Sequence, residues 1–156
     1  MQLDFNKPPK SFWLDTTSQP NYPTLNEDLK VDVAIIGGGF VGISTAYLLS
    51  QLGVKTAVFE ANRILQGTTG HTTAKVTSQH GLIYSKISSQ MNVELAKQYA
   101  DANEAASKMI ERIASENGIA CDYTRESAYV YTLQDENVER IAEEVKTANS
   151  LGIKAN

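Results

Sequence analysis

Three glycines and one acidic residue in this chain are spaced as in proteins that bind a dinucleotide. Gly37, Gly39 and Gly42 form the pattern G-x-G-x-x-G, and Glu60 follows at close to the roughly 20 residues expected for such a site. These positions suit a tight turn at Gly37, the approach of a pyrophosphate at Gly39, and close helix packing at Gly42. A carboxylate at Glu60 can accept hydrogen bonds from ribose hydroxyls. The four residues therefore predict a site for phosphates and ribose.

The segments around these residues predict the secondary structure that such a site needs. Residues 31–36 are rich in Val and Ile, as in a buried parallel strand, and residues 43–52 resemble a helix that ends at Gly53. Residues 55–59 form a second apolar run that leads directly into Glu60. The order of strand, glycines, helix, strand and acid predicts an α/β fold with a Rossmann-like βαβ unit. A βαβ unit that binds no nucleotide is the alternative structural interpretation.

Composition limits the class of protein and its partners. The chain has 156 residues, 42% hydrophobic and 21% charged, which is typical of a globular protein of one domain or slightly more. A net charge of −4 without a Lys/Arg cluster argues against nucleic acid or an anionic membrane as partner. The single cysteine, Cys121, excludes an intrachain disulfide and a Cys-rich metal site, so we expect no metal and a cytoplasmic location. Residues 33–54 carry no charge, but their glycines favour the strand–turn–helix interpretation over a membrane span.

Residues 1–30 are predicted to form an extended N-terminal arm. All four prolines of the chain lie there, and their spacing excludes long helices. The aromatic pair Phe12 and Trp13 could dock this arm onto the surface of the domain. A partly ordered tail anchored by that pair is the simpler interpretation.

A second cluster of small residues follows the acid, at residues 67–73. It contains two glycines and four threonines, whose hydroxyl and backbone N–H groups could line a polar ligand. Clusters of this composition are also common in ordinary loops. The βαβ unit just before the cluster is the reason to consider a binding role.

The second half of the chain is predicted to form a helix, a strand and a helix. Residues 93–117 carry an apolar stripe at helical spacing, and residues 128–133 have high β-propensity. A last helix is expected between Asp135, as its N-cap, and Gly152. Both helical stripes are interpreted as core faces. Their positions are Leu95, Tyr99, Ala102, Ala106, Met109 and Ile113 in the first helix, and Val138, Ile141, Ala142, Val145 and Ala148 in the last.

Taken together, residues 31–42, Glu60 and residues 67–71 resemble the D-amino-acid-oxidase-like superfamily of FAD-dependent oxidoreductases. The hallmark of that superfamily is a glycine-rich βαβ unit, an acid on the second strand and a small-residue loop shortly afterwards. Residues 11–14 and 70–81 look most like bacterial members whose full chains carry a C-terminal Rieske iron–sulfur domain. The resemblance is specific up to about residue 85 and looser beyond it.

The resemblance implies FAD as cofactor and a small-molecule amine or amino-acid-like substrate, from whose C–N carbon the flavin accepts a hydride. It implies a Rossmann-like FAD/NAD(P)-binding region at residues 31–89 and the truncated start of a substrate-side domain at residues 90–156. Complete members are much longer, so we expect an N-terminal fragment, inactive alone, with any [2Fe-2S] cluster in a missing C-terminal domain. The implied cofactor-binding residues are Gly37, Gly39, Phe40, Val41, Gly42, Glu60, Ala61, Thr68, Thr69, His71, Thr72 and Thr73.

Several assignments stay open at this level. A branch of the superfamily bonds its flavin covalently to a His at the place of His71; a hydrogen bond to a phosphate or to the loop backbone is the simpler role. Glu60 suits an NAD ribose equally well, so a nicotinamide-dependent dehydrogenase is an alternative, and so is a non-catalytic nucleotide-binding module. Tyr129 and Tyr131 could face a substrate cavity or one side of an ordinary strand. The sequence names no catalytic residue, no individual substrate and no oligomeric state.

Overall fold

The computed structural model describes residues 8–156, which divide into two compact units, residues 8–74 and residues 75–156. Each unit is described by itself. Residues 1–7 of the predicted arm lie outside the described residues. The predicted domains at 1–30, 31–89 and 90–156 stay predictions.

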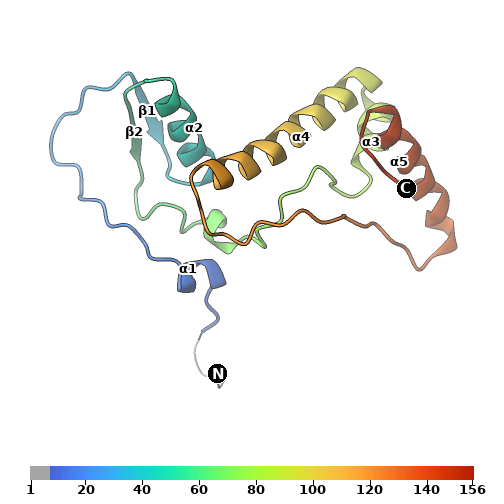
Figure 1. The fold of residues 1–156 in the computed structure, drawn as a ribbon, viewed down its shortest axis with the longest axis horizontal. Coiled ribbons are helices and arrows are strands. Elements are labelled where there is room, and N and C mark those ends of the chain that lie inside the picture. The colour runs from blue at the N-terminus through green and yellow to red at the C-terminus, as the bar shows by residue number, and fades with distance from the viewer. Residues whose placement is uncertain (1–7) are drawn as a thin grey trace. The chain divides into compact units, whose positions relative to one another are not determined.

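The first unit contains a βαβ unit made of β1 (Val33–Ile36), α2 (Phe40–Gln51) and β2 (Thr56–Phe59). The two strands are parallel, with Val33 paired to Thr56 and Ile36 paired to Phe59. Figure 1 shows the strands side by side, with α2 packed next to them. The predicted α/β class is therefore confirmed. The helix begins at Phe40, earlier than the predicted start at residue 43, because Gly39 already serves as its N-cap.

Two glycines allow the helix to start this close to the strand. Gly37 has φ of +103°, a backbone conformation that residues with a Cβ rarely adopt. At Gly42, a Cβ would lie only 1.9 Å from the carbonyl oxygen of Gly37, so any larger residue would push the helix away from the turn. These are the roles that the glycine spacing predicts for these two positions.

Strand β1 is covered on one face. Val33 and Ile35 are half-buried, whereas Ala34 and Ile36 alternate with them on the exposed side, where Ile36 is 83% exposed. The prediction of a strand is confirmed, but the expectation that it is buried on both faces is wrong for the described residues. A strand with apolar residues on both faces can be buried on both, but a face is buried only where another element packs on it.

The N-terminal arm is mostly without regular structure, as its prolines predict, but it contains the short helix α1 (Phe12–Thr16). Trp13 docks as expected: its indole Nε1 donates a hydrogen bond to the carbonyl of Thr72 at 2.8 Å. Thr72 directly follows the short 3₁₀ helix η1 (Thr68–His71). Phe12 makes an edge-to-face ring contact with Trp13 but is itself mainly exposed.

The second unit consists of helices: α3 (Ile83–Gln90), α4 (Val93–Glu116), the 3₁₀ turn η2 (Asp135–Asn137) and α5 (Val138–Ser150). Both long predicted helices are therefore present. The side chain of Asn92 caps α4 by accepting a hydrogen bond from the Leu95 N–H at 2.8 Å. The core of this unit is small and is formed by Tyr84, Ala96, Ala100, Ala148 and Leu151. Among residues 8–156, no helix is both long and apolar enough to cross a membrane.

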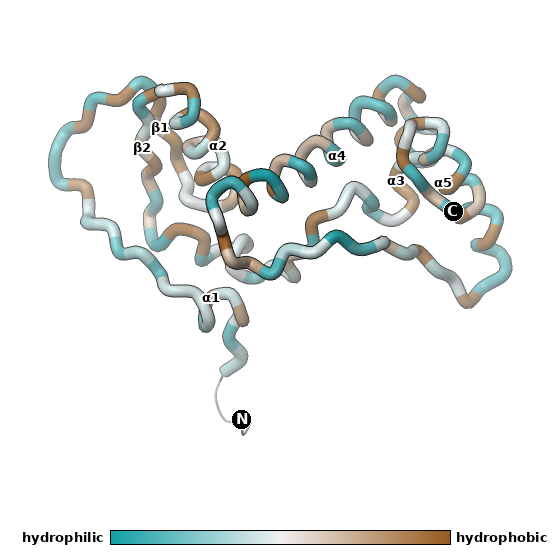
Figure 2. The backbone as a smooth tube through the Cα atoms, in the orientation of Figure 1, coloured by the Kyte–Doolittle hydropathy of each residue, from teal (hydrophilic) through white to brown (hydrophobic). Residues whose placement is uncertain are grey.

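The buried faces of α4 and α5 differ from the predicted stripes. On α4, Leu95 is exposed and the alanines at 96 and 100 are buried instead, because α3 packs on the small-residue side of the helix. Figure 2 shows polar and apolar residues alternating along α4. Hydrophobic spacing alone therefore placed the contact face slightly wrongly. The exposed positions of the predicted stripes are Leu95, Ala102, Ala106, Val138 and Ala142.

Two further predictions about this unit are wrong. Residues 128–133 form no strand: the chain is extended there, but no neighbouring strand offers hydrogen bonds within the described residues. As a result Tyr129 is 85% exposed and Leu133 is 93% exposed. Asp135 is not the N-cap of the last helix, because residues 135–137 form η2, which runs directly into α5.

A buried carboxylate that no sequence pattern predicts joins α5 to α3. Glu144 is only 5% exposed, and its two carboxylate oxygens accept hydrogen bonds from the N–H groups of Tyr84 at 2.9 Å and Ser85 at 2.7 Å. These amides lie in the first turn of α3, where N–H groups have no partner within the helix and negative charge is favoured. Glu144 therefore serves as the cap of α3 from another helix.

Replacing Glu144 by Gln should destabilise the second unit by about 1–3 kcal/mol, because an amide group would place an N–H₂ donor against backbone donors in a buried site. Urea unfolding measures this change. Glu143→Gln is the matched control, since Glu143 is exposed on the same helix. Equal unfolding midpoints for the two variants would show that the cap contributes nothing.

Candidate functional site

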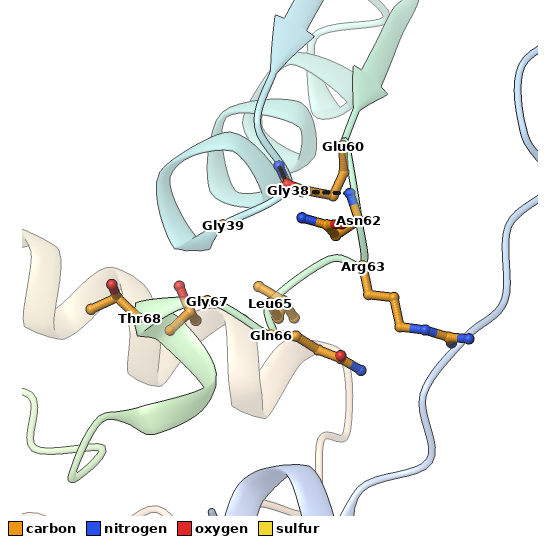
Figure 3. Close-up of a pocket in the computed structure, with 10 residues that line it drawn as sticks. Gly38, Gly39, Glu60, Asn62, Arg63, Leu65, Gln66, Gly67 and Thr68 are labelled. Carbon is orange, nitrogen blue, oxygen red and sulfur yellow. Dashed lines mark hydrogen bonds between the residues drawn. The ribbon is translucent and has the colours of Figure 1, made fainter.

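A pocket of about 500 Å³ lies where the carboxyl ends of both parallel strands meet the start of α2. Ligands of open α/β sheets bind at this edge, just beyond the strands. Figure 3 shows that its residues come from the turn after β1, the segment after β2 and the start of η1. The lining residues are Gly38, Gly39, Glu60, Asn62, Arg63, Leu65, Gln66, Gly67, Thr68 and Thr69.

Glu60 is held in place by backbone amides. One carboxylate oxygen accepts a hydrogen bond from the Gly38 N–H at 2.8 Å, and the other accepts one from the Asn62 N–H at 3.0 Å. The bond from Gly38, followed by that from Asn62, lowers the pKa of the Glu60 carboxyl below its ordinary value. The carboxylate is therefore ionised at neutral pH, and each oxygen keeps a further lone pair for a ligand hydroxyl.

Gly38 joins the turn after β1 to the segment after β2 through hydrogen bonds of its N–H and its carbonyl group. Besides its N–H bond to Glu60, its carbonyl accepts a hydrogen bond from the Leu65 N–H at 2.8 Å. A Cβ at Gly38 would lie 2.6 Å from Cγ2 of Ile64, so a larger residue does not fit without movement. Leu65 itself has φ of +61°, a conformation that is uncommon outside glycine. The floor of the pocket is therefore a tightly packed pair of turns.

Gly39 differs from its neighbours, because the protein itself leaves room for a side chain there. Its φ is −82°, and a Cβ would meet nothing closer than Thr69 Oγ1 at 3.6 Å. The N–H groups of Gly39, Val41 and Gly42 have no acceptor within the described part of the chain. Open space and free amides at a helix N-terminus together form a setting in which an anionic group can be held.

The threonine-rich segment forms η1, and its side chains hold it to the start of the helix. Thr69 Oγ1 accepts a hydrogen bond from the Phe40 N–H at 3.0 Å. Nδ1 of His71 lies 2.8 Å from the carbonyl oxygen of Gly67. A carbonyl can only accept, so Nδ1 carries the proton and Nε2 is the nitrogen left for another partner. His71 thus makes a hydrogen bond to the backbone of its own loop, which was the simpler alternative to a covalent bond with a flavin.

The structure brings only some of the predicted site residues into the pocket wall. Gly39, Glu60, Thr68 and Thr69 line it. The other predicted residues are not in the pocket wall: they lie in the turn after β1, the first turn of α2, the segment after β2 or residues 71–73, and their cofactor roles stay predictions. They are Gly37, Phe40, Val41, Gly42, Ala61, His71, Thr72 and Thr73.

The sequence prediction missed six residues of the wall. Gly38 is the unconstrained x of the glycine pattern, yet it makes the central hydrogen bonds of the site. Asn62 could have been found from its position two residues after Glu60, where its N–H can return to the carboxylate in an Asx-like turn. Gly67 begins the small-residue cluster at residues 67–73 but is not among the predicted site residues, and no pattern in the sequence marks Arg63, Leu65 and Gln66.

The second unit has a smaller pocket of its own, of about 330 Å³. Tyr129 and Tyr131 line it with Lys75 and Gln79. These tyrosines lie on extended chain rather than on a strand, so the ordinary half-buried strand face is not their role here.

Comparison with known proteins gives a consistent result. The family described as FAD dependent oxidoreductase matches residues 32–156. YhfW of Bacillus subtilis (strain 168), named as a Rieske 2Fe-2S iron-sulfur protein, is 41% identical over 94% of this chain and 29% of its own length. Gamma-glutamylputrescine oxidoreductase of Escherichia coli (strain K12) is 25% identical over 85% of this chain and 31% of its own length.

The chain thus spans less than a third of the length of these curated relatives. No solved structure matches the chain.

The lowered pKa of Glu60 predicts a pH-dependent contribution to stability. A carboxyl whose pKa is lower in the folded state stabilises the fold at pH values above the unfolded pKa of about 4.3, and this contribution is lost as the pH falls through the folded pKa. In Glu60→Gln, the free energy of unfolding should therefore fall less between about pH 6 and pH 3 than in the original protein. Urea unfolding at several pH values measures this.

Glu27→Gln is the matched control, since Glu27 is exposed and makes no hydrogen bond within residues 8–156. Identical pH profiles for the Glu60 and Glu27 variants would contradict the assignment.

Proposed function

The chain belongs to the family of FAD-dependent oxidoreductases, and we propose that its first unit is a Rossmann-like region that binds the adenosine diphosphate part of FAD. The observation that carries this proposal is the pocket lined by Gly39 and Glu60, next to the first turn of α2 with its free amides. Phosphates and ribose require these groups, in this order from helix to strand end.

The residues present fit the cofactor. The pyrophosphate would lie against Gly39 and the first turn of α2, where a side chain is absent although the protein has room for one. The ribose hydroxyls would donate to the oxygens of Glu60, which is already oriented by Gly38 and Asn62. Residues 68–73 would then follow the cofactor toward its flavin end. His71 would offer Nε2 to it, and we expect a noncovalent contact.

For the whole protein, we propose an oxidoreductase of the amine or amino-acid oxidase type. Bound FAD would supply the acceptor for a hydride from a C–N carbon of the substrate. The name of gamma-glutamylputrescine oxidoreductase supports an amine-like substrate, and the name of YhfW supports a [2Fe-2S] cluster elsewhere in the whole protein. A cytoplasmic location belongs to the same proposal.

An absorbance spectrum of the purified protein, with and without added FAD, tests the cofactor. We expect the bands of an oxidised flavin, and we expect the colour to pass into the filtrate after denaturation and ultrafiltration. Colour retained on the denatured chain would instead indicate a covalent link and make His71 the first residue to replace. Tighter binding of NADH than of FAD in a parallel titration would favour a nicotinamide-dependent enzyme.

Two glycine variants separate the role of the fold from that of the ligand. Gly39→Ala should unfold like the original protein but bind FAD at least about 10-fold more weakly, because the new methyl group would occupy space needed by the pyrophosphate. Gly42→Ala should lower the free energy of unfolding by about 1–3 kcal/mol, because its Cβ meets the Gly37 carbonyl. Thermal unfolding and FAD titration measure both effects. Unchanged FAD affinity in Gly39→Ala would contradict the proposed position of the pyrophosphate.

A further inference from the structure

The N-terminal arm contacts η1 and Thr72, the residue directly after η1, at several points. The hydroxyl of Ser11 donates a hydrogen bond to the carbonyl of Gly70, and the indole of Trp13 donates one to the carbonyl of Thr72 at 2.8 Å. Leu14 packs on Gly70, where a Cβ would lie only 2.7 Å from Leu14 Cδ2. Hydrogen bonds and close packing from successive residues make this a specific contact, although the arm itself is largely exposed.

The segment that the arm contacts, η1, also forms part of the pocket wall. Gly70 is the residue after Thr69, which lines the pocket and whose hydroxyl accepts the hydrogen bond from the Phe40 N–H. Phe40 is the first residue of α2. A continuous chain of contacts therefore runs from the arm through η1 to the helix N-terminus at the pocket.

The other contacts of η1 explain why the arm matters. The bonds from the Gly70 N–H and from His71 both go to the Gly67 carbonyl, so they shape the turn without fastening it to the rest of the unit. Outside the turn, η1 is held by the Thr69–Phe40 bond and by packing of Gly70 against the Leu65 carbonyl. The arm adds two hydrogen bonds and an apolar contact to this small set.

We propose that Ser11 and Trp13 are positioning residues of the cofactor pocket. By binding the carbonyls of Gly70 and Thr72, they hold η1 in the conformation that presents Thr69 to the pocket and to α2. A loop that is ordered before its ligand arrives loses less conformational freedom on binding, so affinity rises without any contact between arm and ligand. Insofar as the ligand is FAD, this inference rests on the proposed function.

The first test is FAD affinity, measured by fluorescence titration of the full chain. Ser11→Ala and Trp13→Phe each remove one donor, and each should raise the dissociation constant about 3- to 10-fold. Ser11→Thr keeps the hydroxyl and should bind nearly as the original protein does. Ser18→Ala is the matched control, because Ser18 is an exposed serine of the same arm whose side chain makes no hydrogen bond within residues 8–156.

The second test needs no cofactor. Amide hydrogen exchange at Phe40 should be faster in Ser11→Ala and Trp13→Phe than in Ser18→Ala, because loosening η1 exposes the Thr69–Phe40 bond, while exchange in the β1–β2 ladder stays unchanged. Faster exchange at Phe40 in a chain that binds no FAD would leave the positioning role intact and overturn the proposed cofactor. Exchange at Phe40 equal to that of Ser18→Ala would overturn the positioning role, whatever the FAD affinity.

Discussion

The hydrogen bonds at Gly38 are the constraint on which the first unit depends. This residue donates to Glu60 and accepts from Leu65, so the turn after β1 and the segment after β2 are joined at one point. The contact requires the two backbones to approach so closely that Ile64 leaves no space for a Cβ. Both turns are therefore joined at the pocket, and α2 starts there at its N-cap, Gly39.

A carboxylate accepts hydrogen bonds from two backbone amides in each unit. Glu60 does so at the turn before α2, and Glu144 does so in the first turn of α3. The amides that Glu144 binds have no partner within α3, and an anion at a helix N-terminus also interacts favourably with the helix dipole. The two sites differ in burial: Glu60 is open to a ligand, whereas Glu144 is enclosed and serves the fold.

The glycines of the dinucleotide pattern have separate physical reasons. Gly37 is required by its backbone conformation and Gly42 by the carbonyl it faces, so the fold explains both. Gly39 is not explained by the fold, since the protein would accept a Cβ there. A glycine at a position where the fold has room for a Cβ indicates space for a ligand. Family membership supports FAD as that ligand. The described part of the arm does not line the pocket, but Ser11 and Trp13 bind η1 and the residue after it from a part of the chain that is far away in sequence. In turn, η1 supplies Thr68 and Thr69 to the wall.

The sequence by itself determined the βαβ unit, its glycine turn, the acid at the strand end and the two long helices, because each follows from local spacing and residue type. It also indicated Phe12 and Trp13 as a pair that could dock the arm, but not the place where Trp13 docks. Tertiary structure decided that Gly38 and Asn62 hold Glu60, that Glu144 caps a distant helix, and that alanines rather than Leu95 form the contact of α4. Residues 128–133 show the reason: a strand or a buried face exists only when another segment supplies its partner, and local composition does not specify that partner.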